Sequence, residues 1–232
     1  EHVISSNEVF HLAELPKRIV IQGGGYIALE FACIFAGFGS DVTLIYRGEN
    51  VLRGFDDDVR AHVRAEMEKN GITILTGCTV DKVDRHGNEF TSRVLNGSSV
   101  ASDQVLFAIG RHPNVANLGL EKAGVAINPK NGGIAVDGFS QTNVPHIYAV
   151  GDVTHRFNLT PVAIREGHAF ADTVFGNRPT RVDHADIPTA VFSQPEVGTV
   201  GLTEAQARLQ FTTVDIFNAN SYAHDPANDF LN

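Results

Sequence analysis

A glycine-rich turn at residues 23–25 follows an apolar segment, Ile19–Gln22. Together with Ala28 the glycines give the spacing G-x-G-x-x-A, which is typical of segments that bind the pyrophosphate of a dinucleotide. In that pattern Gly23 permits a tight turn, Gly25 lets the backbone approach the phosphates, and Ala28 keeps the next helix close to the strand. The helix N-terminus adds free N–H groups and the positive end of a dipole. The alternative interpretation is a structural turn that binds no ligand.

Two arginines follow the next apolar segment, Asp41–Tyr46. In a unit that prefers NAD, the second strand usually ends in an acidic residue that accepts hydrogen bonds from the ribose hydroxyls. Here Tyr46 ends that strand, Arg47 follows it, and Arg53 belongs to the same loop. Guanidinium groups suit a 2′-phosphate, which arginine can bind through two hydrogen bonds. We therefore expect NADPH rather than NADH, although Glu49 argues the other way and the arginines could instead be solvated surface charges.

The segments around these residues alternate between strand and helix patterns. One helix is expected at Tyr26–Ala36 and a second at Asp56–Asn70, whose acidic first turn suits a helix N-terminus. Short segments rich in β-branched residues predict three strands, Ile19–Gln22, Asp41–Tyr46 and Ile72–Leu75. This order predicts an α/β fold with a right-handed βαβαβ unit and a parallel sheet.

The pattern after this unit changes twice. Hairpin-like strands that would form a meander over the sheet come first, followed by one apolar strand: Thr79–Arg85, Glu89–Leu95, Ser99–Ser102 and Gln104–Ile109. A loop-rich region then predicts a loop at Asn114–Gly124, strands at Ile134–Val136 and Ile147–Val150, and a helix at Pro161–Gly176. The last region predicts strands at Thr189–Phe192, Gly198–Gly201 and Thr213–Phe217, with a helix that begins in a capping box at Thr203.

The composition is that of a globular protein. The 232 residues are 43% hydrophobic and 19% charged, and the formal net charge of −9 argues against nucleic acid or an anionic membrane as the main partner. No apolar segment approaches the ~18 residues of a membrane span, and no signal peptide is evident. The histidines show no metal-ligand spacing, so no metal site is expected. Cys33 and Cys78 are expected to be reduced core residues of a cytoplasmic protein.

Six motifs occur in a fixed order along the chain. They are Gly23–Glu30, Tyr46–Arg53, Ala108–Arg111, Ile147–Asp152, Leu159–Ala163 and Thr199–Thr203. In this order, over about residues 1–217, the chain resembles the pyridine-nucleotide–disulfide oxidoreductases, and most closely the members that reduce glutathione disulfide. The resemblance implies an NADPH-binding Rossmann-like domain at 1–112, the C-terminal part of an FAD-binding domain at 113–185, and an incomplete α+β dimerisation domain at 186–232.

The resemblance also implies roles for the residues that would contact NADPH. Gly23, Gly25 and Ala28 would hold the pyrophosphate, while Arg47 and Arg53 would hold the 2′-phosphate. Further cofactor contacts are implied along the turn and in the loop that borders the nucleotide, at Ile27, Ala108, Ile109, Gly110 and Arg111.

Two residues of the first helix would take part in catalysis if the resemblance holds. Tyr26 resembles the gate that covers the flavin and swings away to admit nicotinamide, and Glu30 resembles the carboxylate near the nicotinamide. The alternative for Tyr26 is core packing against the helix. The alternative for Glu30 is an ordinary charge on a helix face.

A second cofactor, FAD, is implied by the motifs in the middle of the chain. Asp152, after Gly151, resembles the acid that binds a ribityl hydroxyl, and Thr160 resembles the residue whose backbone meets the isoalloxazine edge. Leu159-Thr160-Pro161 suits a helix start, because proline is tolerated in the first turn. That helix end would favour a reduced, anionic flavin. The alternatives are a loop acid or N-cap for Asp152 and a simple N-cap for Thr160.

The resemblance is incomplete in ways that affect activity and substrate. The sequence holds neither the C-x-x-x-x-C redox pair nor the His-Pro…Glu motif of the family, which suggests truncation at both ends, and Asn218–Asn232 does not resemble the family. His168 stands where several members carry an arginine that contacts glutathione, so the identity of the disulfide is open. A homodimer is expected for a full-length protein.

Three interpretations therefore remain open. The first is the central piece of an NADPH-dependent FAD disulfide reductase that acts on glutathione disulfide or a related disulfide, the fragment alone being inactive. The second is an NADPH-binding module without turnover. The third is a non-functional remnant whose tail comes from a shifted reading frame.

Overall fold

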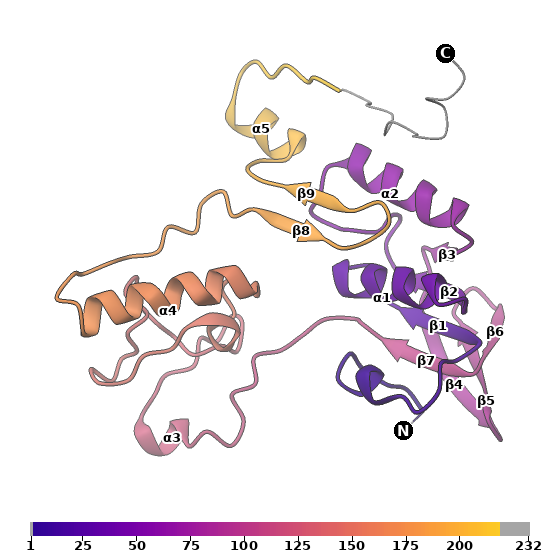
Figure 1. The fold of residues 1–232 in the computed structure, drawn as a ribbon, viewed down its shortest axis with the longest axis horizontal. Coiled ribbons are helices and arrows are strands. Elements are labelled where there is room, and N and C mark those ends of the chain that lie inside the picture. Colours follow the sequence, from indigo (N-terminus) through magenta and orange to yellow (C-terminus); the bar gives the residue numbers. More distant parts are fainter. Residues whose placement is uncertain (1, 219–232) are drawn as a thin grey trace, which may run out of the picture.

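The computed structural model describes residues 2–218, which form two lobes joined by extended segments (Figure 1). The first lobe is built on a parallel sheet with the strand order β3-β2-β1-β7. Its strands are β1 (Arg18–Gln22), β2 (Asp41–Tyr46), β3 (Thr73–Thr76) and β7 (Gln104–Phe107). Helices α1 (Tyr26–Gly37) and α2 (Asp57–Lys69) connect the first three strands, so the expected βαβαβ unit is confirmed.

Burial explains why β1 and α1 meet so closely at the glycine turn. β1 lies between β2 and β7, and Ile19, Val20 and Ile21 are all buried, as expected for a central strand covered on both faces. The side of α1 that faces the sheet carries Ala28 and Leu29, which are fully buried in the same core. The small alanine side chain lets the helix start close to the end of β1.

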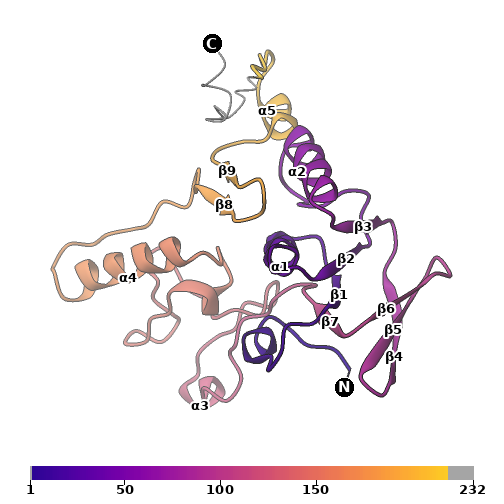
Figure 2. The ribbon, with the colours of Figure 1, turned by 45° about the vertical axis from the view of Figure 1, so that its right-hand side comes forward.

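The opposite face of the sheet is covered by an antiparallel meander, as the sequence predicts (Figure 2). Its strands are β4 (Val80–His86), β5 (Glu89–Val94) and β6 (Ser99–Ser102). Phe90 and Val94 of the meander share a core with Val20 and Val105 of the parallel sheet. The sheet is therefore held between α1 on one face and the meander on the other.

The second lobe has less regular structure than the sequence predicts. It contains α3 (Leu120–Ala123), the 3-10 turn η2 (Gly151–Thr154) and the long helix α4 (Thr160–Val174). The expected strands at Ile134–Val136 and Ile147–Val150 are wrong, because only isolated bridges form at Ile134 and Tyr148. Each of these bridges pairs with a loop rather than with a strand. The expected loop at 114–124 likewise misses α3.

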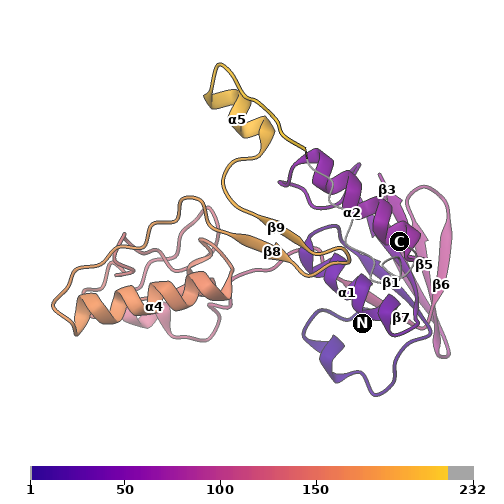
Figure 3. The same ribbon diagram turned by 45° about the horizontal axis from the view of Figure 1, so that its top comes forward.

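The last described segment returns to the first lobe as a hairpin above α1 (Figure 3). It consists of β8 (Thr189–Val191) and β9 (Val197–Thr199), followed by α5 (Glu204–Gln210). The capping box at Thr203 is confirmed, since its hydroxyl accepts from Gln206 N and the Gln206 side chain accepts from Thr203 N. The expected strand at 213–217 is wrong, because these residues pair with no strand within residues 2–218. The tail beyond residue 218 lies outside the described residues.

Two further hydrogen bonds tie this segment to the helices of the first lobe. Glu204 N donates to Asp56 Oδ1 at 2.6 Å, so the residue before α2 holds the start of α5. Gln194 N donates to Cys33 Sγ at 3.3 Å. Cys33 and Cys78 are both buried and free, as expected.

Among residues 2–218, no helix is long and apolar enough to cross a membrane. The same part of the chain contains no group of three or more metal-ligating side chains.

Candidate nucleotide-binding site

A cavity of about 720 Å³ lies where β1, β2 and β7 end, beside the glycine turn. It brings together most of the residues singled out from the sequence: Gly23, Gly25, Tyr26, Ile27, Arg47, Arg53, Ala108, Ile109, Gly110, Arg111 and Leu159. It also contains residues that the sequence reasoning missed: Gln22, Gly24, Tyr46, Thr79, Val80, Phe107, His155 and Asn158. A cavity at the carboxyl ends of parallel strands is where open α/β sheets bind ligands.

The glycine turn has the geometry that the spacing predicts. Gly23 has a φ of +150°, and a Cβ at this position would lie 2.4 Å from the carbonyl oxygen of Ala108. A Cβ at Gly25 would meet no atom within 4 Å, so this residue opens toward the cavity. Gly25 is also the N-cap of α1, and no side chain caps this helix. The first N–H groups of α1 are therefore available to an anionic ligand.

The middle glycine of the turn, Gly24, is required for a different reason. A Cβ at Gly24 would lie 2.4 Å from Cγ of Tyr46, so the tyrosine ring fills the space beside it. A Cβ at Gly48 would lie 2.5 Å from the same ring. Gly24 also accepts a hydrogen bond from Leu52 N at 2.7 Å. The run of three consecutive glycines was the available sequence signal, but G-x-G-x-x-A leaves its middle position, Gly24, unspecified.

Arg47 and Arg53 approach the cavity from the loop between β2 and α2. Both side chains are exposed, and within residues 2–218 neither makes a hydrogen bond or an ion pair. Glu49, the residue that argued for NADH, does not line the cavity. Two exposed cations without protein partners form a site that can bind a phosphate.

Gln22 fixes the wall between the parallel sheet and the meander. This buried side chain donates from Nε2 to Thr79 Oγ1 at 2.6 Å and accepts from Val80 N at 2.9 Å. The amide thereby joins the end of β1 to the start of β4, and all three residues line the cavity. A polar residue at the end of an otherwise apolar strand was the sequence signal for this role.

Tyr26 and Glu30 both lie on α1 but face different surroundings. Tyr26 lines the cavity and is 39% exposed, and burial of its ring is the main cause that raises the pKa of its hydroxyl, followed by the charge of Glu30. Glu30 does not line this cavity. Its Oε1 accepts a hydrogen bond from Phe192 N at 3.0 Å. Glu30 instead lines a second cavity, of about 570 Å³, which it shares with Ile27 and Arg111.

The residues expected to contact FAD lie on the second lobe. Gly151 has a φ of +71°, and a Cβ there would approach Ala163 Cβ to 2.9 Å. Asp152 follows it on η2 with an exposed side chain, and the strand expected before it, Ile147–Val150, does not form. Thr160 and Pro161 begin α4 as expected, and both are exposed. Of these residues and Leu159, only Leu159 lines the main cavity.

Glu166, which the sequence reasoning missed, holds the Asp152 turn in place. Its carboxylate is only 1% exposed. Oε2 accepts from Gly151 N at 2.6 Å, and Oε1 lies 2.8 Å from both Arg156 Nη2 and His184 Nε2. An acidic residue among the buried positions of α4, four residues after Val162, was the available signal.

Asn158 carries an unpaired acceptor in the cavity wall. Its Oδ1 is buried and has no hydrogen-bond partner within the described residues, while its Nδ2 lies 3.2 Å from His155 Nδ1. Both residues line the cavity, and His155 has a φ of +51°. A buried acceptor without a partner is costly unless a ligand or another segment supplies a donor. This atom is therefore suited to an amide or hydroxyl group of a bound cofactor.

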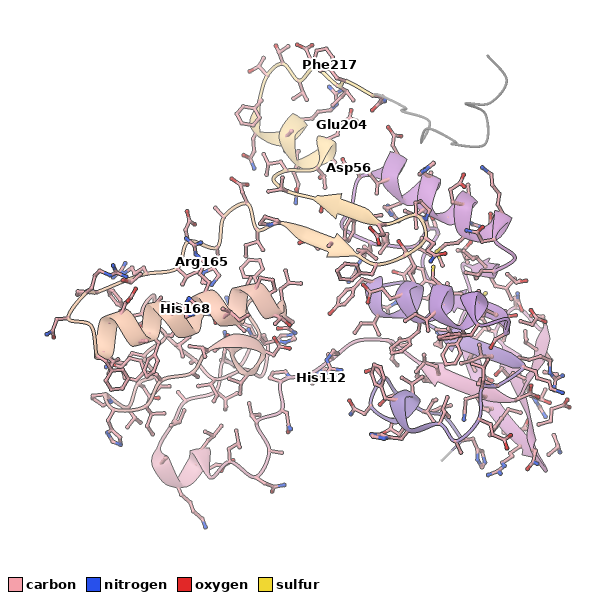
Figure 4. All side chains as sticks on the ribbon, viewed as in Figure 1. Asp56, His112, Arg165, His168, Glu204 and Phe217 are labelled. Carbon is pink, nitrogen blue, oxygen red and sulfur yellow. The ribbon has the colours of Figure 1, made fainter. Side chains whose placement is uncertain are left out.

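His168, the candidate substrate residue, is separate from both cavities. It lies exposed on α4 near Arg165 in the second lobe (Figure 4). The structure therefore does not bring His168 together with the nucleotide residues.

Comparison with known proteins agrees with this arrangement. The family model described as pyridine nucleotide-disulphide oxidoreductase matches residues 1–167, and the model of its dimerisation domain matches residues 187–228. The glutathione reductase of Burkholderia cepacia is 50% identical over 94% of this chain and 48% of its own length. The trypanothione reductase of Trypanosoma congolense is 45% identical over 94% of this chain and 45% of its own.

Among solved structures, the HOCl-induced flavoprotein disulfide reductase RclA from Escherichia coli has the same fold. It superposes with a TM-score of 0.83 at 33% identity, over 89% of this chain and 47% of that protein. The chain thus spans about half the length of the relatives it matches. The matched residues and the fold together show that the chain belongs to the pyridine nucleotide-disulphide oxidoreductase family.

Proposed function

We propose that this chain carries the NADPH site and part of the FAD site of a flavoprotein disulfide reductase that acts on glutathione disulfide. The observation that supports it most strongly is the cavity at the glycine turn, which is lined by the open Gly25 and by two arginines, Arg47 and Arg53, whose side chains have no hydrogen-bond or ion-pair partner among residues 2–218. These features suit a pyrophosphate, which NADPH and NADH share, and a 2′-phosphate, which only NADPH carries.

Different residues of the chain are proposed to bind NADPH and FAD. In this proposal Gly23 and Gly25 hold the pyrophosphate at the start of α1, which the buried Ala28 keeps close to β1, and Tyr26 covers the place where nicotinamide would enter. The loop 108–111 borders the nucleotide. When bound, NADPH supplies a hydride and FAD passes the electrons to a disulfide.

The FAD part of the proposal rests on the second lobe. Asp152 offers an exposed carboxylate that can accept a hydrogen bond from a ribityl hydroxyl. Thr160 and Pro161 place the start of α4 at the flavin edge, where the helix dipole favours negative charge. Glu30 is proposed to lie near the nicotinamide, although its carboxylate contacts Phe192 N in this structure.

The redox cysteine pair of this proposal is not among these 232 residues. Cys33, on α1, and Cys78, between β3 and β4, are buried and free, and no C-x-x-x-x-C is present in the 232 residues. A disulfide reductase needs an attacking thiolate and a resolving thiol. We therefore assign turnover to a protein that contains this chain together with the half of the relatives' length that it does not span.

Glutathione disulfide is the substrate we propose, because the glutathione reductase of Burkholderia cepacia is a relative at 50% identity. Trypanothione reductase at 45% identity makes a related disulfide the near alternative. His168 is the proposed substrate contact. We further propose domains at 1–112, 113–185 and 186–232, a homodimer formed through the last of these, and a cytoplasmic location.

The second candidate function is an NADPH-binding module without turnover. The observation that favours it is that the proposed phosphate contacts Gly23, Gly25, Arg47 and Arg53 all line one cavity, whereas of the FAD candidates only Leu159 does. In that case the purified chain would bind NADPH and remain colourless.

The test is a turnover assay on the longest protein that carries this segment, with NADPH oxidation followed by absorbance. The proposal expects a bound flavin spectrum, consumption of NADPH with glutathione disulfide, and slow reaction with NADH. A His168→Arg variant should change the KM for glutathione disulfide more than kcat. Flavin binding with no reaction toward any disulfide would contradict the proposed activity.

A further inference from the structure

The loop that carries Arg47 and Arg53 is fixed to the protein at its centre. Val51 and Leu52 are almost fully buried, although they lie between exposed arginines. Leu52 has a φ of +52°, a left-handed conformation that is unfavourable for a branched residue, and its N–H donates to Gly24 O at 2.7 Å. Surrounding contacts must hold such a backbone in place.

Arg60, on α2, supplies contacts of this kind. Its Nε donates to Val51 O at 2.8 Å, and its Nη2 donates to Asn50 O at 3.0 Å. Its Nη1 pairs with Asp57 Oδ1 at 2.6 Å, which orients the guanidinium from the first turn of the same helix. The Arg60 side chain is only 19% exposed. The planar guanidinium therefore binds two successive carbonyl groups of the loop at once.

These contacts have a consequence for the two arginines at the cavity. The side chains of Arg47 and Arg53 make no hydrogen bonds within residues 2–218. The position of each guanidinium therefore depends on the backbone of the loop that carries it. Arg60 does not line the cavity. We propose that Arg60 is a positioning residue that sets the preference of this chain for nucleotides with a 2′-phosphate, by holding the loop between Arg47 and Arg53. This inference rests on the proposed NADPH site.

Arg64 provides a matched control on the same helix. It lies one turn after Arg60, carries the same charge and pairs with Glu68 at 3.0 Å. Among residues 2–218, its only hydrogen bond to the loop is a long one, 3.4 Å from Nη1 to Glu49 O. Loss of Arg64 therefore removes a positive charge near the loop while the two carbonyl contacts of Arg60 remain.

The experiment titrates the chain with 2′,5′-ADP and with 5′-AMP. Both ligands carry the adenosine and the 5′-phosphate, and only 2′,5′-ADP carries a 2′-phosphate. The dissociation constant for 5′-AMP divided by that for 2′,5′-ADP is the preference ratio, which reports 2′-phosphate recognition without FAD or turnover. We expect Arg60→Gln and Arg60→Lys to lower this ratio by about five- to tenfold, because neither replacement can bind both carbonyls in one plane. Arg64→Gln should change it less than about twofold.

The two Arg60 variants keep the inference testable if one of them fails to fold, which circular dichroism would reveal. An unchanged ratio in folded Arg60→Lys would overturn the inference, as would an equal fall in Arg64→Gln or a parallel loss of both ligands. Arg47→Ala separates this outcome from failure of the proposed function. If Arg47→Ala lowers the ratio while Arg60 variants do not, only the inference fails; if wild type shows no preference, the NADPH proposal fails as well.

Discussion

The ring of Tyr46 occupies the space that a side chain at Gly24 would need, with Cγ of the tyrosine 2.4 Å from the ideal Cβ position. Gly25, the next residue, has open space at the same position and a φ of −86°. Two adjacent glycines in one turn are therefore required for different reasons. Gly24 is needed for packing, whereas Gly25 keeps the cavity open.

This difference predicts that two alanine substitutions affect different properties, one the stability of the fold and the other NADPH binding. Gly24→Ala should lower the free energy of unfolding by about 1–3 kcal/mol, because the tyrosine ring must move. Gly25→Ala should change it by less than about 1 kcal/mol yet weaken NADPH binding, since the methyl group would stand where the phosphates approach. Urea unfolding and calorimetric titration of both variants measure the two effects. Equal stability losses in the two proteins would refute the separation of roles.

The buried carboxylate of Glu166 predicts a stability effect in the second lobe. Glu166→Gln keeps the volume but removes the charge that faces Arg156 and His184, and it should destabilise the protein by about 2–4 kcal/mol. Asp172→Asn on the same helix is the control, because its ion pair with Arg178 is largely exposed and should cost less than about 1 kcal/mol. Thermal unfolding of the two variants gives the comparison. Similar losses of stability in the two variants would contradict the prediction that the buried charge of Glu166 contributes more than the Asp172 ion pair.

Asp103 predicts a pH dependence of stability. Hydrogen bonds from the Arg18 side chain, the largest cause, hold the pKa of this carboxyl below its ordinary value of 3.8. A lowered pKa in the folded state adds stability above the unfolded value, and that stability is lost as the pH falls through the folded value. Asp103→Asn should therefore be less stable at pH 7, by less than about 1 kcal/mol, and should lose less stability below about pH 4. Urea midpoints from pH 7 to pH 3 test this; parallel curves for the two proteins would contradict it.

The first lobe could be predicted closely because its pattern is local and strong. Asp41–Tyr46 and Ser99–Ser102 match the expected strands, and the other strands of this lobe differ by two residues or fewer. The second lobe and the C-terminal segment could not be predicted as well. Ile134–Val136 and 213–217 are apolar enough for strands, but a strand also needs a neighbour to accept its hydrogen bonds, and single-sequence reasoning does not supply one.

The nucleotide residues could be listed from the sequence because they sit in short motifs that share one sheet edge. The residues that support them could not, because their contacts join different elements and loops of the fold. Gln22 reaches Thr79, and Arg60 reaches Val51 across the loop to α2. Glu166 reaches Gly151 from inside a helix, where an acidic residue usually indicates an exposed face. Only the fold shows these side chains to be buried and paired.

The most direct test of the central claim is calorimetric titration of this chain with NADPH and with NADH, in wild type and Arg47→Ala. A phosphate–guanidinium pair predicts that wild type binds NADPH at least about tenfold more tightly than NADH. Most of that difference should disappear in Arg47→Ala, while NADH affinity stays nearly constant. Equal affinity of the wild-type chain for the two nucleotides would contradict the account.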